Sequence, residues 1–143
     1  MELEIKSYVG VGPIELGMSR DQVMHSVGKQ PKQFFKGPKS VIATDNFGDL
    51  GFHVYYKNVS GEVCNAVEMF SPADPSFEGH RFINRSVNEI LSWLKNLDPA
   101  VKIGDSGLTS YELGFGVYVP NISEAFNALV EAVIVFERDY YKK

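Results

Sequence analysis

The chain has 143 residues, of which 44% are hydrophobic and 22% are charged, as is usual for a globular protein that can build its own core. Its formal net charge of −4 argues against a nucleic-acid-binding protein, which would carry a basic surface. Cys64 is the only cysteine, which excludes an intramolecular disulfide and a zinc site built on paired cysteines.

The N-terminal sequence MELEIKSYVGVG is acidic and has no basic stretch followed by an apolar run, so we expect no signal peptide. No apolar run approaches the roughly 18 residues of a membrane span. We therefore expect a cytoplasmic protein without a membrane-inserted segment.

Residues 19–27 are predicted to form a short helix. Ser19, with Gln22 three residues later, fits a capping box, and Gly28 suits the position that follows a helix. In the segments that follow, we expect four strands, at 32–36, 40–45, 51–56 and 64–70.

Residues 71–80, SPADPSFEGH, contain two prolines and are predicted to be a linker. A second helix is predicted at 86–97, where Ser86 and Glu89 repeat the capping-box spacing. Its inward side chains recur at helical spacing: Val87, Ile90, Leu91 and Leu94. Strands are expected near 101–104, 108–112, 113–119 and 129–137, and a single helical turn is expected to begin at Ser123.

The sequence contains an internal repeat. The stretch LGFHVYYKN at 50–58 returns as LGFGVYVPN at 113–121, and AVEMF at 66–70 matches AVIVF at 132–136. The two helix starts precede these matches in the same order, which indicates a duplicated unit of one helix followed by antiparallel strands. We predict an α+β fold in which this duplicated unit forms a single sheet or curved surface with helices on one face. Residues 1–143 would be a single domain built from two units, at about 12–72 and 80–143.

The repeated strand alternates in character. Phe52, Val54 and Tyr56 would face a core, while His53 and Tyr55 would face away from it. Tyr118 takes the place of Tyr55 in the second copy. Tyrosine is enriched at protein interfaces, so these two tyrosines are candidates for contact with a partner as well as ordinary half-exposed strand residues.

Recognisable catalytic patterns are missing from the sequence. The three histidines, His25, His53 and His80, have no metal-binding spacing, and there is no phosphate-binding loop or nucleophile elbow. We expect Cys64 to be a buried strand residue. The chain is therefore predicted not to be an enzyme and to bind no cofactor or metal.

Charge is distributed unevenly along the chain. Between Ile103 and Phe136 there is no lysine or arginine, while four lysines lie between residues 29 and 39. An acidic second half could attract a basic protein. It could equally be a solvated face without a partner.

Three stretches resemble small bacterial immunity proteins that are encoded beside polymorphic toxins, including those of contact-dependent growth inhibition systems. They are GVGPIELGMSRDQV, TDNFGDLGFHVYY with GEVCNAVEMF, and LGFGVYVPN with VEAVIVFERDYY, and together they span nearly the whole chain. The LGMSRDQV stretch also resembles tandem-repeat inhibitors such as the β-lactamase inhibitor protein, and small outer-membrane assembly lipoproteins. The chain departs from the lipoproteins in having no lipid-accepting cysteine near its start, and from the secreted inhibitor in lacking disulfide cysteines.

This resemblance implies a protein that binds the C-terminal domain of a cognate toxin, which we expect to be a basic cytoplasmic nuclease. It would act as a monomer or weak homodimer and would bind no nucleic acid and no membrane. The resemblance does not identify the binding residues. From charge and strand alternation, the candidates are Asp45, Asp49, Tyr55, Asp105, Glu112, Tyr118 and Glu124.

Two other functions remain open. A small-molecule binding module would place a pocket between helices and sheet, lined by Phe34, Phe47, Phe52 and Trp93. A structural or assembly protein would use the duplicated sheet to dimerise.

Overall fold

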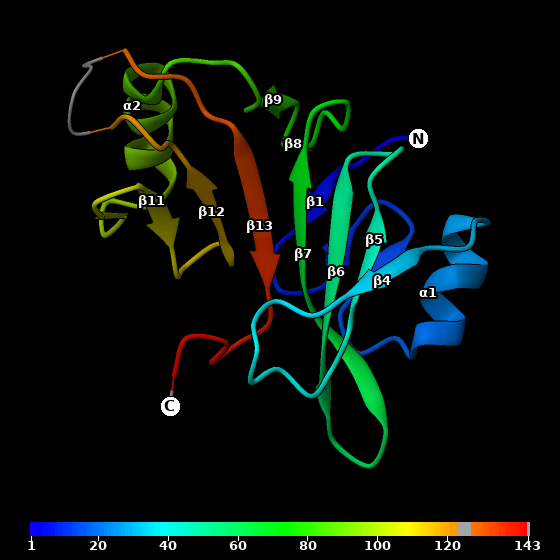
Figure 1. The fold of residues 1–143 in the computed structure, drawn as a ribbon. Coiled ribbons are helices and arrows are strands. Elements are labelled where there is room, and N and C mark those ends of the chain that lie inside the picture. Colours follow the sequence, from blue (N-terminus) through cyan, green and yellow to red (C-terminus); the bar gives the residue numbers. More distant parts are fainter. Residues whose placement is uncertain (123–126, 143) are drawn as a thin grey trace.

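A computed structural model describes residues 1–122 and 127–142 of the chain (Figure 1). Its elements are, in order, β1 (Ile5–Lys6), β2 (Gly10–Val11), β3 (Ile14–Glu15), α1 (Arg20–Val27), β4 (Lys32–Phe34), β5 (Thr44–Phe47), β6 (Phe52–Asn58), β7 (Glu62–Phe70), β8 (Ser76–Phe77), β9 (His80–Arg81), α2 (Val87–Leu97), β10 (Lys102–Ile103), β11 (Gly107–Ser110), β12 (Phe115–Tyr118) and β13 (Ala132–Phe136).

Eight strands form one antiparallel sheet in the order β10-β11-β12-β13-β7-β6-β5-β4. Every neighbouring pair except one is consecutive in the chain. The exception is β13 with β7, which joins the two halves at the centre of the sheet and sets Glu68 opposite Ile134. The strands β1 to β3 form a small separate sheet, and β8 pairs with β9.

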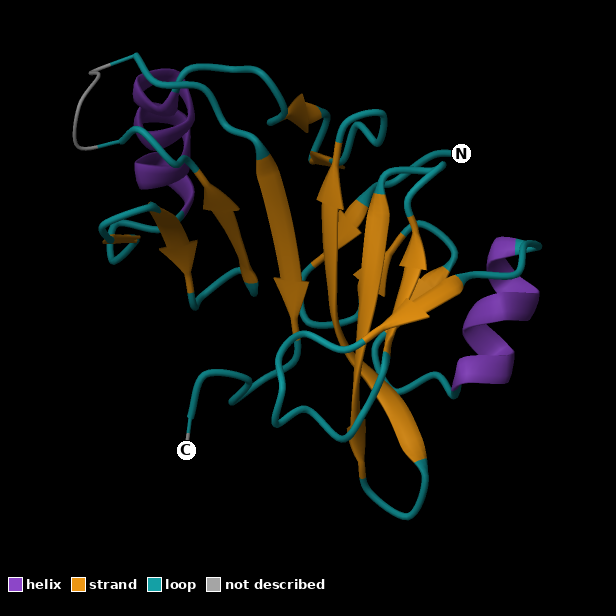
Figure 2. Ribbon diagram, in the orientation of Figure 1, coloured by secondary structure: helices purple, strands orange, loops and turns teal. Residues whose placement is uncertain are grey.

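Each half of the large sheet is preceded by one helix: α1 comes before β4 to β7, and α2 comes before β10 to β13. Figure 2 shows α1 beside the strands of the first half and α2 beside those of the second. The serine before each helix also forms an isolated β-bridge, Ser19 with Val63 in β7 and Ser86 with Leu129 just before β13. An antiparallel sheet with two helices confirms the predicted α+β class.

Local capping signals place the helices. The Ser19 hydroxyl accepts a hydrogen bond from the Gln22 backbone N–H at 3.2 Å, and the Gln22 side chain accepts one from the Ser19 N–H at 2.9 Å. Gly28 ends α1 with φ of 77°. In α2 only half of the expected capping box forms: Ser86 accepts from Glu89, whose carboxylate instead lies 3.4 Å from Arg85.

One face of the sheet carries the core. Phe52, Val54 and Tyr56 are 0%, 0% and 7% exposed, as their alternation predicted, and Phe115 and Val117 of the second copy are buried on the same face of the sheet. Both helices and the small sheets pack on this face, and they contribute these buried residues to the core: Ile5, Val11, Ile14, Val23, Phe77, Val87, Ile90 and Leu94. Leu91 is partly buried against it.

The opposite side, which we call the open face, has neither helix packed on it among the described residues. In Figure 1 the segment between β4 and β5 runs in front of this face, and the C-terminal segment lies at its other side. Lys36 of the first segment contacts Tyr55, on the open face of β6.

Two expectations about the chain's course are wrong, and one small sheet was not predicted. Residues 40–43 are not a strand, because the predicted second strand begins only at Thr44. Residues 71–80 are more than a linker, since they contain β8 with its buried Ser76 and Phe77. The small sheet formed by residues 5–15 was not expected, because its two-residue strands are too short to show periodicity. The helical turn expected at Ser123 lies outside the described residues.

Candidate functional site

Strand register determines which side chains meet on the open face. His53 lies opposite Glu68, Glu68 opposite Ile134, and Ile134 opposite Gly116, so these four form one row across four strands. The larger side chains of the open face include Lys32, Phe34, His53, Tyr55, Lys57, Glu68, Phe70, Tyr118, Ile134 and Phe136. Aromatic rings dominate this set, and Glu68, near its centre, is its one carboxylate.

Aromatic side chains surround His53 in the first half of the open face. Its ring centroid lies 4.9 Å from that of Phe34 and 4.8 Å from that of Phe70, both in edge-on geometry. Burial lowers the pKa of His53, and the nearby Glu68 carboxylate only partly opposes this. His53 is therefore a neutral packing residue at pH 7, and it fills the space on this side of Glu68.

Glu68 is held by one neighbour, and no cation lies beside it in the described part of the chain. The Tyr55 hydroxyl donates a hydrogen bond to Glu68 Oε1 at 2.6 Å. Burial and this bond raise the pKa of Tyr55, so the hydroxyl stays protonated and remains a donor. The Lys36 ammonium lies over the Tyr55 ring, 3.8 Å from its centroid. Among the described residues, no lysine, arginine or histidine nitrogen lies within 4.0 Å of the Glu68 carboxylate.

Beside Glu68 the open face is hollowed into a shallow depression of about 290 Å³, which we call the acidic trough. Its lining includes Glu68, Asp105, Tyr118, Ile134 and Tyr141. Tyr118 and Tyr141 are 45% and 51% exposed. Two carboxylates and no cation occur among the described residues that line it.

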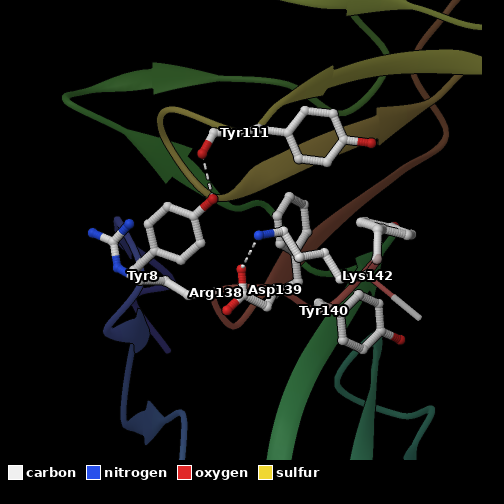
Figure 3. Close-up of a pocket in the computed structure, with 8 residues that line it drawn as sticks. Tyr8, Tyr111, Arg138, Asp139, Tyr140 and Lys142 are labelled. Atoms are coloured by element: carbon white, nitrogen blue, oxygen red, sulfur yellow. Dashed lines mark hydrogen bonds and ion pairs between the residues drawn. The ribbon is translucent and has the colours of Figure 1, made fainter.

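A second depression, of about 510 Å³, lies next to the trough, and we call it the aromatic pocket. It is lined by Tyr8, Tyr111, Phe136, Arg138, Asp139, Tyr140, Tyr141 and Lys142. Figure 3 shows Tyr8, Tyr111 and Tyr140 around this pocket, with Arg138 alongside the Tyr8 ring. Because Tyr141 lines both depressions, they are adjacent and share a wall.

Internal contacts hold the aromatic pocket together. The Tyr8 hydroxyl donates to the Tyr111 carbonyl oxygen, and the Arg138 guanidinium lies 4.2 Å from the centroid of the Tyr8 ring. Phe136, 1% exposed, lies under the rings of Tyr140 and Tyr141. Burial raises the pKa of Tyr140 to about 12, so its hydroxyl is neutral at pH 7.

Asp45 is not where the sequence analysis expected it. It lies in β5, on the core side of the sheet, and is 2% exposed. Its carboxylate accepts hydrogen bonds from Arg20 at 2.7 Å, Gln33 at 2.9 Å and Tyr56 at 2.7 Å. Since all three bonds are internal, Asp45 stabilises the fold and cannot reach a partner.

The other candidates fall into separate groups. Asp105 and Tyr118 line the acidic trough, and Tyr55 reaches it through Glu68. Asp49, 87% exposed, pairs with Lys29 at 3.2 Å and does not line the trough.

Glu112 is exposed in the turn between β11 and β12, at the opposite end of β11 from Asp105. Glu124 lies outside the described residues. The structure thus brings together only part of the predicted set.

Sequence reasoning did not select Glu68 or Tyr141. A signal for Glu68 was present, because AVEMF places a carboxylate where AVIVF has Ile134. A charged residue amid an apolar strand indicates a special environment. No comparable signal marks Tyr141, because the other residues that line the acidic trough are distant from it in sequence.

The aromatic quartet expected to line a ligand pocket does not come together. Phe47 and Phe52 pack against each other in the core at 5.1 Å, while Phe34 lies on the open face. Trp93 stacks on His80 at 4.1 Å. The prediction of a ligand pocket between helices and sheet with this lining is therefore wrong.

The Cys64 thiol is buried, and burial raises its pKa to about 12, so it is not a thiolate at neutral pH. Within residues 1–122 and 127–142, no three His, Cys, Asp or Glu side chains are close enough to hold a metal ion. In the same part of the chain, neither helix has the length and apolar character needed to cross a bilayer.

Comparison of the chain with family models, with curated proteins and with solved structures finds no match.

Proposed function

We propose that this chain is an immunity protein that neutralises a cognate toxin domain by forming a stoichiometric complex through its open face. The observation that carries the proposal is that this face has no helix packed on it among the described residues, yet presents aromatic side chains around a carboxylate without a cation. Aromatic residues on a rigid support are typical of binding hot spots. The immunity role itself rests on the resemblance stated above.

The charges of the open face favour a basic partner. Glu68 and Asp105 lie in the acidic trough, and the whole chain carries a formal net charge of −4. A nuclease domain presents a basic surface to its substrate, and an acidic inhibitor can occupy that surface in place of phosphates. We therefore propose a cytoplasmic nuclease as the toxin. A standard interface of about 1,600 Å² in total would suffice.

We also propose that the large sheet arose by duplication of a helix-plus-four-strands unit. The matching segments AVEMF and AVIVF pair with each other about a local two-fold axis, with Ala66 opposite Phe136 and Phe70 opposite Ala132. The bridges made by Ser19 and Ser86 are equivalent under the same relation. A duplicated unit would give a broad binding surface that one unit could not supply.

The test begins with the reading frame directly upstream of the one encoding this chain. Its C-terminal domain would be expressed in cells with and without this protein, and growth would be followed. We expect the domain to be toxic, growth to be rescued, and the two proteins to copurify. Absence of toxicity, or toxicity without rescue, would contradict the proposal.

A matched pair of variants locates the interface. Tyr118→Ala should weaken the complex by about tenfold or more, because it removes an exposed aromatic from the open face. Leu97→Ala truncates a comparably exposed residue, 38% against 45%, on α2. Affinity should be unchanged in this control, and equal losses in both variants would argue against the open face.

The aromatic pocket supports a second candidate function, the binding of a small molecule with a flat ring. Five aromatic side chains from three separate chain segments converge there (Figure 3). This function predicts an increase in melting temperature with such a compound and no protein partner, which a thermal-shift screen would detect. A Tyr111→Ala variant should lose that increase.

A further inference from the structure

The acidic trough exists because glycines stand where the first half of the sheet has side chains. In the repeated strand, Gly116 replaces His53, whose ring fills the corresponding space in the first half. Gly107, which lies opposite Tyr118, likewise leaves the trough without a side chain at that point. A Cβ at Gly107 would lie 2.0 Å from the Val117 carbonyl oxygen, so this position tolerates no larger residue.

The two equivalent tyrosines differ in one respect. In the first half, the Lys36 ammonium lies over the Tyr55 ring. Tyr118, the equivalent residue in the second half, has no lysine or arginine over its ring among the described residues. The second half thus has the aromatic ring but not the cation.

The carboxylates of the trough are also unpaired. Tyr55 occupies Glu68 Oε1, while Oε2 has no hydrogen-bond donor among the described residues. Asp105 likewise makes no ion pair with any residue that the structure describes. An apolar ligand would desolvate these carboxylates without compensating them, which is unfavourable.

We propose that the acidic trough binds the guanidinium group of one arginine side chain, supplied by the partner protein. Guanidinium is planar, stacks on aromatic rings and donates paired hydrogen bonds to a carboxylate. In the trough it would lie against Tyr118 and Tyr141 and donate to Glu68 and Asp105. An ammonium can be attracted by the same charges but has no planar face with which to stack on an aromatic ring. This inference rests on the proposed function, because it names the chemistry by which the same open face recognises a basic partner.

The test needs no toxin, so its failure is distinguishable from failure of the proposed function. The intact ¹⁵N-labelled protein would be titrated with N-acetyl-arginine methylamide and followed by NMR chemical shifts. N-acetyl-citrulline methylamide, the neutral isostere, is the matched control probe. We expect weak saturable binding of the arginine compound alone, with shift changes concentrated at residues that line the trough.

Variants assign the binding to its carboxylates. Glu68→Gln should weaken binding of the arginine probe about tenfold, since charge-assisted bonds to one carboxylate are lost. Should this variant fold poorly, Asp105→Asn, in an exposed turn, should still weaken it severalfold. Glu2→Gln removes an exposed carboxylate elsewhere and should have no effect.

Three outcomes would overturn the inference: equal shifts with the citrulline compound, arginine-induced shifts centred on another surface, or unchanged binding in both trough variants.

Discussion

Replacing Arg20 by methionine should destabilise the protein substantially, because it leaves a buried carboxylate without its cation. Arg20 Nη1 lies 2.7 Å from Asp45, and the side chains are 19% and 2% exposed. The same guanidinium donates to Glu62 and lies over the Tyr56 ring, 4.1 Å from its centroid. Methionine keeps much of the length and apolar contact of the arginine stem, so the substitution chiefly removes charge and donors.

The expected loss in the free energy of unfolding is about 3 kcal/mol. Removing one partner of a buried ion pair costs about 3–5 kcal/mol. Two neutral donors, Gln33 and Tyr56, still satisfy Asp45 in the variant, which favours the lower end of that range. Because small domains have a total stability of about 5–15 kcal/mol, the variant should remain folded at room temperature.

Urea unfolding followed by tryptophan fluorescence would measure the loss, since Trp93 is the only tryptophan. Lys29→Met is the matched control: its pair with Asp49 spans 3.2 Å, but the side chains are 47% and 87% exposed. Exposed pairs contribute about 0–1 kcal/mol, so this variant should lose no more than that. A loss below about 1 kcal/mol for Arg20→Met, or equal losses in both variants, would refute the assignment of Asp45 as a structural residue.

Three further predictions concern single positions. Gly51→Ala should lower the free energy of unfolding by more than about 2 kcal/mol in a urea titration, because φ is +88° and a Cβ would lie 2.3 Å from a carbonyl oxygen. Gly28→Ala is its control: φ is +77° but no atom lies near the added Cβ, so the loss should be only about 1 kcal/mol. Burial lowers the pKa of His53 in the folded protein, although Glu68 partly opposes this, so the unfolded chain binds the imidazole proton more tightly. The free energy of unfolding should therefore fall as the pH decreases from 6.5 towards the lower pKa of the folded state. His53→Gln should remove this part of the pH dependence, and superimposable profiles would contradict it. Cys64 should react with a thiol reagent only when the protein unfolds, and rapid labelling of the native protein would show that the thiol is accessible.

Features encoded by neighbouring residues were predicted well. The Ser19 capping box and Gly28 give the limits of α1, because both signals act within one helical turn. The alternation around Phe52 identified the core face of β6, because side-chain direction in a strand depends only on its period of two.

Features that depend on residues distant in the sequence were not predicted. The sequence analysis expected Asp45 to be exposed, and the structure shows it buried. Its burial depends on contacts with Arg20 and Tyr56, which are 25 and 11 residues away in the chain. Tyr141 becomes part of the site only because the chain returns over the open face after β13. No local sequence pattern contains that information, so the residues of the acidic trough could be identified only from the structure.

The position of β13 has a consequence for synthesis of the chain on the ribosome. Among the described strands this one is synthesised last, yet it pairs on one side with β7 and on the other with β12, in the interior of the sheet. Until Phe136 has emerged, the backbone donors and acceptors on the edges of β7 and β12 that will pair with β13 have no native partner. Unpaired strand edges of this kind pair readily with other chains. Nascent molecules are therefore exposed to misassembly until β13 has emerged, and a stop codon shortly before residue 132 should yield insoluble fragments.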